Sequence, residues 1–146
     1  MSTMEKYKKD YIVFAEAGFI AINQADEDAA VKLFKAAETL EPNNHLPRIG
    51  MGYLHLCKLE LKQAVKIFEE ILQDEPHNEM AKAFLGISLS LNPKEVDHGE
   101  KVLMQAAKEA HDPMVKDLAK NALDFVEKFV KKAAPPMQSQ PPKKSK

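Results

Sequence analysis

The sequence repeats with a period of 34 residues, and this period constrains the fold more than any other feature of the chain. A shift of 34 residues superimposes Gly18 on Gly52, and a second shift superimposes Gly52 on Gly86. Glycine occurs only 5 times among the 146 residues, so three glycines at one repeat position do not follow from composition. The first shift also superimposes Ala30 on Ala64, Phe34 on Phe68, Glu41 on Glu75, Pro42 on Pro76 and Asn44 on Asn78. A unit of this length is typical of two helices joined by a turn and stacked on similar neighbours.

The repeated positions have a consistent physical interpretation. A glycine inside a helix costs about 1 kcal/mol relative to alanine, so its recurrence indicates that another helix approaches closely there. A small residue and an aromatic residue one turn later lie on one face of the second helix and would fill the space between helices. Proline cannot continue a helix and ends the unit. These positions are Gly18, Ala30, Phe34 and Pro42 in the first unit, Gly52, Ala64, Phe68 and Pro76 in the second, and Gly86 in the third.

The third unit carries the same pattern with an offset of one residue. Its first helix contains Gly86 and is expected to end at Asn92 and Pro93. The small and the bulky residue of its second helix are Gly99 and Leu103, each one residue later than the period requires. A small insertion in the turn between the two helices explains the offset.

Residues 113–132 predict one further amphipathic helix. Asp112 is suited to cap its first turn, and Pro113 is suited to begin it. Its apolar residues form a broad stripe, which is expected to cover the exposed core of the third unit. The stripe consists of Val115, Leu118, Ala119, Ala122, Leu123, Phe125, Val126 and Phe129.

These features resemble the tetratricopeptide repeat, a helix-turn-helix unit of 34 residues with glycine in the first helix, alanine and an aromatic residue in the second, and proline at the exit. The resemblance implies an all-α fold of three tandem units, at about residues 11–44, 45–78 and 79–112, in a right-handed superhelical array capped by the helix at 113–132. Residues 1–10 are expected to extend the first helix. Residues 133–146 contain four prolines and no apolar periodicity, which predicts a disordered tail.

The predicted first helices carry apolar residues beyond those that a repeat core needs. In each helix these residues follow at spacings of 3 and 4 and form one stripe. Tetratricopeptide arrays turn their first helices to the concave side, so the resemblance implies an apolar groove for an amphipathic helix or an extended apolar peptide of another protein. Packing of the stripe within the chain's own core is the alternative. The stripe consists of Ile12, Ala15, Phe19 and Ile22, then Leu46, Ile49, Tyr53 and Leu56, then Met80, Ala83 and Ile87, which either Ser90 or Leu91 can continue.

No residue pattern indicates an enzyme, a cofactor or a metal site. The five histidines form no HExxH pattern, and the single cysteine, Cys57, has neither a disulfide partner nor a CxxC neighbour. The five glycines are spread along the chain and form no phosphate-binding loop. We therefore expect neither catalysis nor a cofactor, and a reducing compartment suits the free thiol.

Charge and hydropathy exclude two further classes. Residues 1–127 carry 15 basic and 22 acidic groups, and residues 128–146 carry six lysines and no acid. An acidic body repels nucleic acid, so no nucleic-acid partner is expected. No stretch approaches the roughly 18 apolar residues of a membrane span, and residues 1–9 lack the apolar segment of a secretory leader. A cytoplasmic protein without membrane insertion is expected.

The resemblance also narrows the kind of partner. Tetratricopeptide domains that grip the acidic C-terminus of chaperones carry lysine and asparagine where this chain has Ala15, Phe19, Ile49 and Tyr53, so that clamp is not expected. The short array is similar to the small chaperones of bacterial type III secretion systems. One subgroup covers the amphipathic helix of the needle subunit, prevents its premature polymerisation and is braced by a second small helical protein.

Another subgroup of these chaperones holds an extended segment of the translocator proteins. The compact length and the apolar groove favour the needle subgroup. An adaptor or scaffold without chaperone activity stays open as a different class. A homodimer through the unliganded groove is a further expectation, because two apolar grooves can cover each other.

Overall fold

All regular secondary structure within residues 6–131, the part of the chain that this computed structural model describes, is helical, and the predicted all-α class is therefore confirmed. Seven α-helices follow one another, with a short 3₁₀ turn before the first and a π-helical segment after the last. The elements are η1 (Lys8–Asp10), α2 (Tyr11–Asn23), α3 (Glu27–Leu40), α4 (Leu46–Cys57), α5 (Leu61–Asp74), α6 (Glu79–Ser90), α7 (Val96–Glu109), α8 (Pro113–Phe125) and η2 (Val126–Lys131).

Side-chain caps define the start of several helices. The carboxylate of Asp26 accepts a hydrogen bond from the backbone N–H of Ala29 at the start of α3, and the side chain of Asn78 accepts one from Ala81 at the start of α6. Asp112 caps α8 by accepting from the N–H of Met114, as the sequence predicts. These caps satisfy backbone donors that have no partner within the helix.

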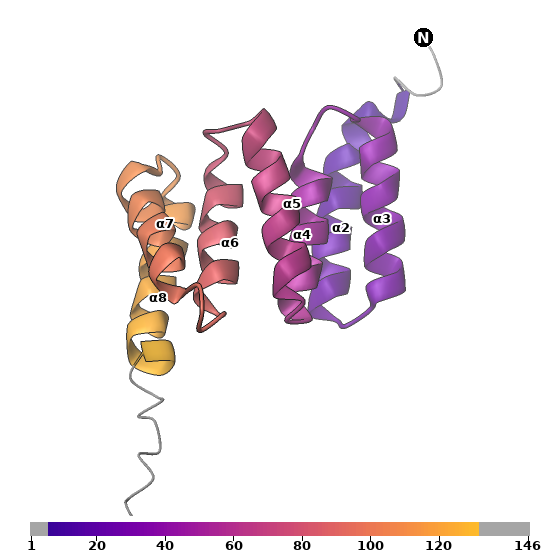
Figure 1. Cartoon of the computed structure of the whole chain (residues 1–146). Coiled ribbons are helices and arrows are strands. Elements are labelled where there is room, and N and C mark those ends of the chain that lie inside the picture. Colours follow the sequence, from indigo (N-terminus) through magenta and orange to yellow (C-terminus); the bar gives the residue numbers. More distant parts are fainter. Residues whose placement is uncertain (1–5, 132–146) are drawn as a thin grey trace, which may run out of the picture.

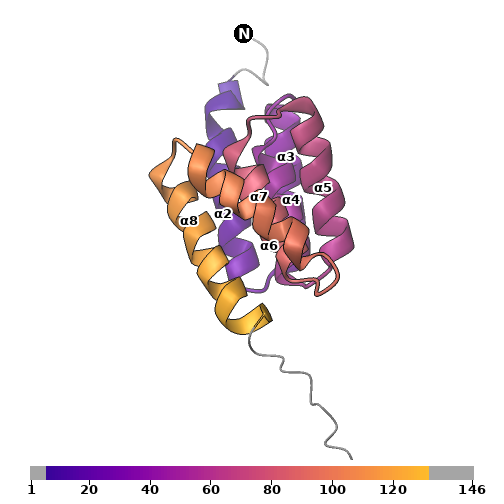
Figure 2. The same cartoon turned by 60° about the vertical axis from the view of Figure 1, so that its left-hand side comes forward.

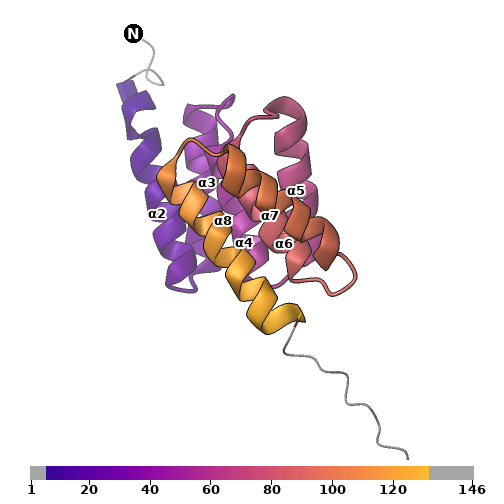
Figure 3. The same cartoon turned by 90° about the vertical axis from the view of Figure 1, so that its left-hand side faces the viewer.

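The helices are arranged as successive antiparallel pairs in two layers. Figure 1 shows the pairs α2/α3, α4/α5 and α6/α7 following one another in chain order, and Figures 2 and 3 show α8 beside α7 at the end of the stack. The first helices contact each other in series, α2 with α4, α4 with α6 and α6 with α8. Within residues 6–131 no comparable contact joins α3 to α5 or α5 to α7. We call α2, α4, α6 and α8 the inner layer and α3, α5 and α7 the outer layer.

The outer helices lie close to the glycines of the inner helices. A Cβ atom at Gly52 would lie 2.6 Å from the Phe68 ring, and one at Gly86 would lie 2.7 Å from the Leu103 side chain. Both distances are too short for packed carbon atoms, so each bulky residue fills the space that the missing Cβ leaves. Because Leu103 takes the position of Phe68, the offset in the third unit is absorbed in the longer turn between α6 and α7.

The other repeated positions have the burial that a packed repeat requires. Gly18 and the side chains of Ala30, Phe34, Ala64 and Phe68 are buried. Pro42 and Pro76 lie exposed in the turns that follow α3 and α5. Ala25 and Leu59 occupy another equivalent repeat position, in the turns that follow α2 and α4. They are the only non-glycine residues of the described chain with a positive φ, which is 58° at both.

The two ends of the described chain differ from the predictions. Residues 8–10 form a 3₁₀ turn rather than a continuation of the first α-helix, and residues 1–5 lie outside the described part. The terminal helix is α-helical only to Phe125 and continues as the π-helical η2. The stripe predicted to cover the core is also divided, because Val115, Ala119 and Val126 are buried whereas Phe125 and Phe129 are exposed. The predicted tail, residues 133–146, lies outside the described residues.

The helices are too short or too polar to cross a lipid bilayer, as judged over residues 6–131. This agrees with the absence of a long apolar run in the sequence.

Candidate protein-binding surface

The inner helices α4 and α6 direct their charged side chains away from the inner surface. Together they carry Arg48, His55, Glu79 and Lys82. Arg48 donates to Glu70 of α5 at 2.7 Å, and His55 lies 3.5 Å from Glu60, which directly precedes α5. Both side chains are therefore turned toward the outer helix of their own pair.

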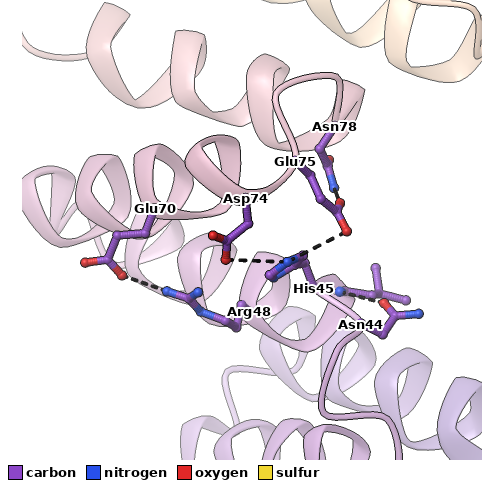
Figure 4. Close-up of polar contacts among 8 residues, drawn as sticks. Asn44, His45, Arg48, Glu70, Asp74, Glu75 and Asn78 are labelled. Carbon is purple, nitrogen blue, oxygen red and sulfur yellow. Dashed lines mark hydrogen bonds and ion pairs between the residues drawn. The ribbon is translucent and has the colours of Figure 1, made fainter.

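A similar contact with the outer helix is present at the N-terminus of α4. His45, which directly precedes α4, lies 3.8 Å from Asp74 and 3.7 Å from Glu75 at the end of α5. Figure 4 shows His45 and Arg48, at the start of α4, pointing toward the carboxylates of Glu70, Asp74 and Glu75 in and just after α5. The contacts lie on the side of α4 that packs against the outer layer.

The charged side chains of α6 are held in the same way. Glu79 accepts hydrogen bonds from the backbone N–H groups of His111, at 2.6 Å, and Asp112, at 3.0 Å. These two bonds hold the pKa of the Glu79 carboxyl below the ordinary value of a glutamate. Lys82 donates to Glu109 of α7 at 3.2 Å. The inner surface of α4 and α6 is left without a charged side chain of its own.

An aromatic row occupies this uncharged surface. The Phe19 ring lies 5.9 Å from the Tyr53 ring, and the Tyr53 ring stacks on Phe84 at 5.3 Å. Phe19 also contacts the buried Phe34 edge-on at 5.2 Å, which ties the row to the outer layer. Burial raises the pKa of the Tyr53 phenol, and its hydrogen bond with Cys57 raises the pKa further. The three rings are half-buried, and Phe84 also packs on the buried Phe68 ring at 5.6 Å.

The structure divides the predicted groove residues into two groups. Five of them are core residues, because their positions face the neighbouring helices, and their assignment to the groove is corrected here. These buried residues are Ala15, Ile22, Ile49, Leu56 and Ala83. The other six keep part of their surface accessible, and these are Ile12, Phe19, Leu46, Tyr53, Met80 and Ile87. The predicted stripe is therefore wider than the accessible surface.

A pocket extends the inner surface between α6 and α8. It has a volume of about 270 Å³, and no polar atom contributes to its exposed lining. Its walls are Ile87, Leu91, Ala122, Phe125 and Val126. Of these, Ile87 belongs to the predicted groove, and Leu91 is, with Ser90, one of the two possible continuations of its stripe. Ala122, Phe125 and Val126 belong to the stripe predicted to cover the core, although the position of α8 as the last α-helix of the described residues is a signal that part of its surface is exposed.

A second pocket gathers polar side chains, and both of its carboxylates have hydrogen-bond donors within the protein. It lies between the start of α6 and the end of α7 and includes His77, Glu79, Glu109 and His111. Glu79 is occupied by two backbone donors, and Glu109 accepts from both Gln105 and Lys82. Over residues 6–131, no group of three or more His, Cys, Asp or Glu side chains is placed to hold a metal ion.

Comparisons with known proteins add no relative to these observations. No family model matches the sequence, and no curated protein or solved structure matches it significantly. Any statement on function therefore rests on the residues and the geometry of this chain.

Proposed function

We propose that the protein is a tetratricopeptide-type chaperone that covers an amphipathic helix of a client protein with its inner surface. In this proposal three helix-turn-helix units form a right-handed superhelical array, and α2, α4, α6 and α8 line its concave side. The observation that carries the proposal is the apolar, uncharged inner surface of α4 and α6. Soluble monomers rarely expose such a surface without a partner.

Two features support the choice of repeat architecture. The bulky residue of each outer helix fills the space beside the glycine of its partner helix, as the repeat pattern requires. The inner helices contact one another in series, and no comparable contact joins the outer helices within residues 6–131. A stack that curves toward its inner layer would produce this difference.

The chemistry of the surface favours a helix over an extended peptide. An extended segment would bury backbone N–H and C=O groups that need hydrogen-bond partners. The pocket between α6 and α8 offers none, because its lining is apolar, and Tyr53 carries the one polar group of the aromatic row. A helix satisfies its backbone internally and buries only side chains. This argument favours a client of the needle-subunit kind over a translocator segment.

A client that polymerises would need a protein that covers its apolar helix. A subunit that polymerises through its own apolar helix must keep that helix shielded until it is exported. Burying it against the inner surface removes apolar area from water, which stabilises the complex by about 25 cal/mol per Å². The chaperone would work in a reducing cytoplasm, where the exposed Cys57 stays free.

The proposed complex includes a second small helical protein. This protein would bind the exposed side of α2. Val13 is 61% exposed and Ile20 is 56% exposed. The equivalent residues of α4, Pro47 and Leu54, are buried behind the preceding helix α3. A helix of the second protein would cover Val13 and Ile20 as α3 covers its neighbour.

Co-purification from the native cell tests the function. The tagged wild-type chain is compared with Tyr53→Ser, and Met104→Ser is the control because Met104 is 62% exposed on the outer helix α7. We expect the wild type and the control to recover a small protein with an amphipathic helix, identified by mass spectrometry, and Tyr53→Ser to lose it. The recovered protein should polymerise or aggregate once released. Recovery of large folded enzymes alone would exclude the chaperone and favour an adaptor.

The homodimer expected for an unliganded groove is examined with the same variants. Sedimentation of the isolated wild-type chain would show a dimer that Tyr53→Ser dissociates and Met104→Ser does not. A dimer that persists in Tyr53→Ser would not involve the inner surface.

A further inference from the structure

The end of α8 and the segment η2 form an apolar corner beside the inner surface. Phe125 is 48% exposed and Phe129 is 60% exposed, and their rings lie 5.1 Å apart. Phe125 is also one wall of the 270 Å³ pocket between α6 and α8. Two neighbouring aromatic residues exposed next to an apolar pocket are unfavourable in water unless another molecule covers them.

Two contacts with neighbouring helices hold this corner in place. Val126 is buried in the cluster formed with α7 and α8. Lys131, at the end of η2, donates to Glu100 of α7 at 2.6 Å and lies 3.9 Å from Asp97. Anchors at both ends of η2 therefore fix the segment, and Phe125 and Phe129 stay on its open side. Short π-helical segments occur frequently at functional sites.

The pocket is continuous with the proposed binding surface. Ile87, which lines it, occupies the same repeat position as Phe19 and Tyr53 in the preceding units. Neighbouring packed helices lie about 8–10 Å apart, so a path over the four inner helices is about 30 Å long. A helix of about 20 residues has that length. One ligand helix can contact the aromatic row and the pocket together.

We propose that this pocket is the anchor subsite of the proposed client surface and receives one large apolar side chain of the client helix. The inference rests on the proposed function and adds the feature of the client that the surface selects. The apolar lining excludes an anchor with a charged, carboxyl or amide group, because such a group would lose its water without compensation. An apolar cavity of about 150 Å³ can hold a benzene ring, so a pocket of 270 Å³ admits an aromatic or a branched aliphatic side chain.

The test uses the absence of tryptophan from the chain, which allows a tryptophan in the ligand to be observed alone. The probe is a set of synthetic amphipathic helical peptides of about 20 residues. They share one Leu, Lys and Glu sequence and differ only in which apolar position carries the single tryptophan. The full-length chain is titrated into each peptide, and the emission maximum and the dissociation constant are recorded. We expect one tryptophan position to show a larger blue shift than the others.

Three variants assign that position to the pocket. Phe125→Ser should abolish the extra blue shift and weaken binding on the order of tenfold, which corresponds to about 1.4 kcal/mol. Ala122→Phe should do the same by filling the pocket, although it adds apolar area. Met114→Ser should leave both quantities unchanged, because Met114 is 78% exposed on α8 and does not line the pocket.

The outcomes separate the subsite from the surface. If Tyr53→Ser weakens binding whereas Phe125→Ser and Ala122→Phe do not, the anchor subsite is excluded and the proposed function stands. If Ala122→Phe binds the peptides more tightly, the corner is only a nonspecific apolar surface, and the anchor subsite is excluded. If no peptide binds the wild type, or if Tyr53→Ser binds as the wild type does, the inner surface itself fails.

Discussion

The large apolar residues of the outer layer are buried more deeply than the aromatic residues on the open side of the inner layer. The outer layer encloses Phe34, Phe68 and Leu103 almost completely, with exposed fractions of 1%, 0% and 0%. The inner layer leaves Phe19 and Tyr53 half-buried, although these rings are as large. Each outer helix packs between two inner helices, and its apolar face is closed on both sides. An inner helix has one side that no element of the described chain covers.

This difference shows which apolar residues maintain the fold and which remain available. Residues between the layers supply most of the burial that stabilises the array. Residues on the inner surface contribute less to folding, because they lose less contact with water. The two sets should separate in mutational experiments, and the following predictions are ordered by the size of the expected effect.

The largest effect is expected for Phe68→Ala. Phe68 is completely buried and fills the space beside Gly52, so its loss leaves a cavity between α4 and α5. We expect a loss of about 3–5 kcal/mol in the free energy of unfolding, measured by urea denaturation with circular dichroism. Tyr53→Ala is the matched inner-layer variant and should lose less than half as much. Equal losses for the two variants would contradict the separation of the layers.

A smaller loss is expected for Gly52→Ala. Alanine favours a helix over glycine by about 1 kcal/mol, so propensity alone predicts stabilisation. The new Cβ would lie 2.6 Å from the Phe68 ring, and the two layers would have to move apart. We expect a net loss of about 1–3 kcal/mol from this overpacking.

Gln63→Ala, on the exposed face of α5, is the control for the glycine variant. It should change stability by less than about 0.5 kcal/mol. The double variant Gly52→Ala with Phe68→Leu should recover part of the loss, because leucine has no ring at the contact. Stabilisation by Gly52→Ala alone would show that the layers are not in close contact at this position.

The sequence was sufficient to predict the layer that carries the fold. Gly52 and Phe68 recur at a fixed period, and the close contact that they imply is present. The sequence was less successful with the inner surface, because a stripe of apolar residues does not show which of its members face neighbouring helices. Ile49 and Tyr53 lie one turn apart on α4, yet Ile49 is 4% exposed and Tyr53 remains half-buried.

The end of the array could not be predicted for a different physical reason. The periodicity of apolar residues shows which face of a helix is apolar. It does not show whether a later helix packs on that face. Phe125 belongs to an apolar stripe and is exposed because no later element packs on it within the described residues. The pocket beside it depends on the path of α8 across α6, which is a tertiary contact without a local signal.

A pH-dependent effect is expected where Glu79 joins the inner layer to the start of α8. Its two backbone hydrogen bonds favour the carboxylate, and the folded-state pKa is lower than the ordinary value. The stabilisation is therefore fully present above the ordinary glutamate pKa and is lost as the pH falls through the lowered pKa. Glu79→Gln should reduce stability at neutral pH, and its difference from the wild type should vanish in acid.

Urea denaturation at a series of pH values measures this dependence. Glu38→Gln, an exposed carboxylate of α3, is the control and should run parallel to the wild type. A constant difference between Glu79→Gln and the wild type down to the acid limit would show that the charge of Glu79 makes no contribution.

The smallest effect is expected in the turn that joins the two layers of the second unit. Leu59 has φ of 58°, a left-handed conformation that costs a residue with a side chain on the order of 1 kcal/mol. Its side chain is 69% exposed, so removing it sacrifices little packing. Leu59→Gly removes this backbone strain from the folded state, which stabilises the protein. Glycine also raises the conformational entropy of the unfolded chain, which destabilises the protein, so the two effects oppose each other. We expect a net stabilisation of at most about 1 kcal/mol and a rise of about 2–4 °C in Tm. Leu59→Ala keeps the strained conformation and should not raise Tm, so a rise of equal size in both variants would assign the gain to the loss of an exposed leucine rather than to the backbone.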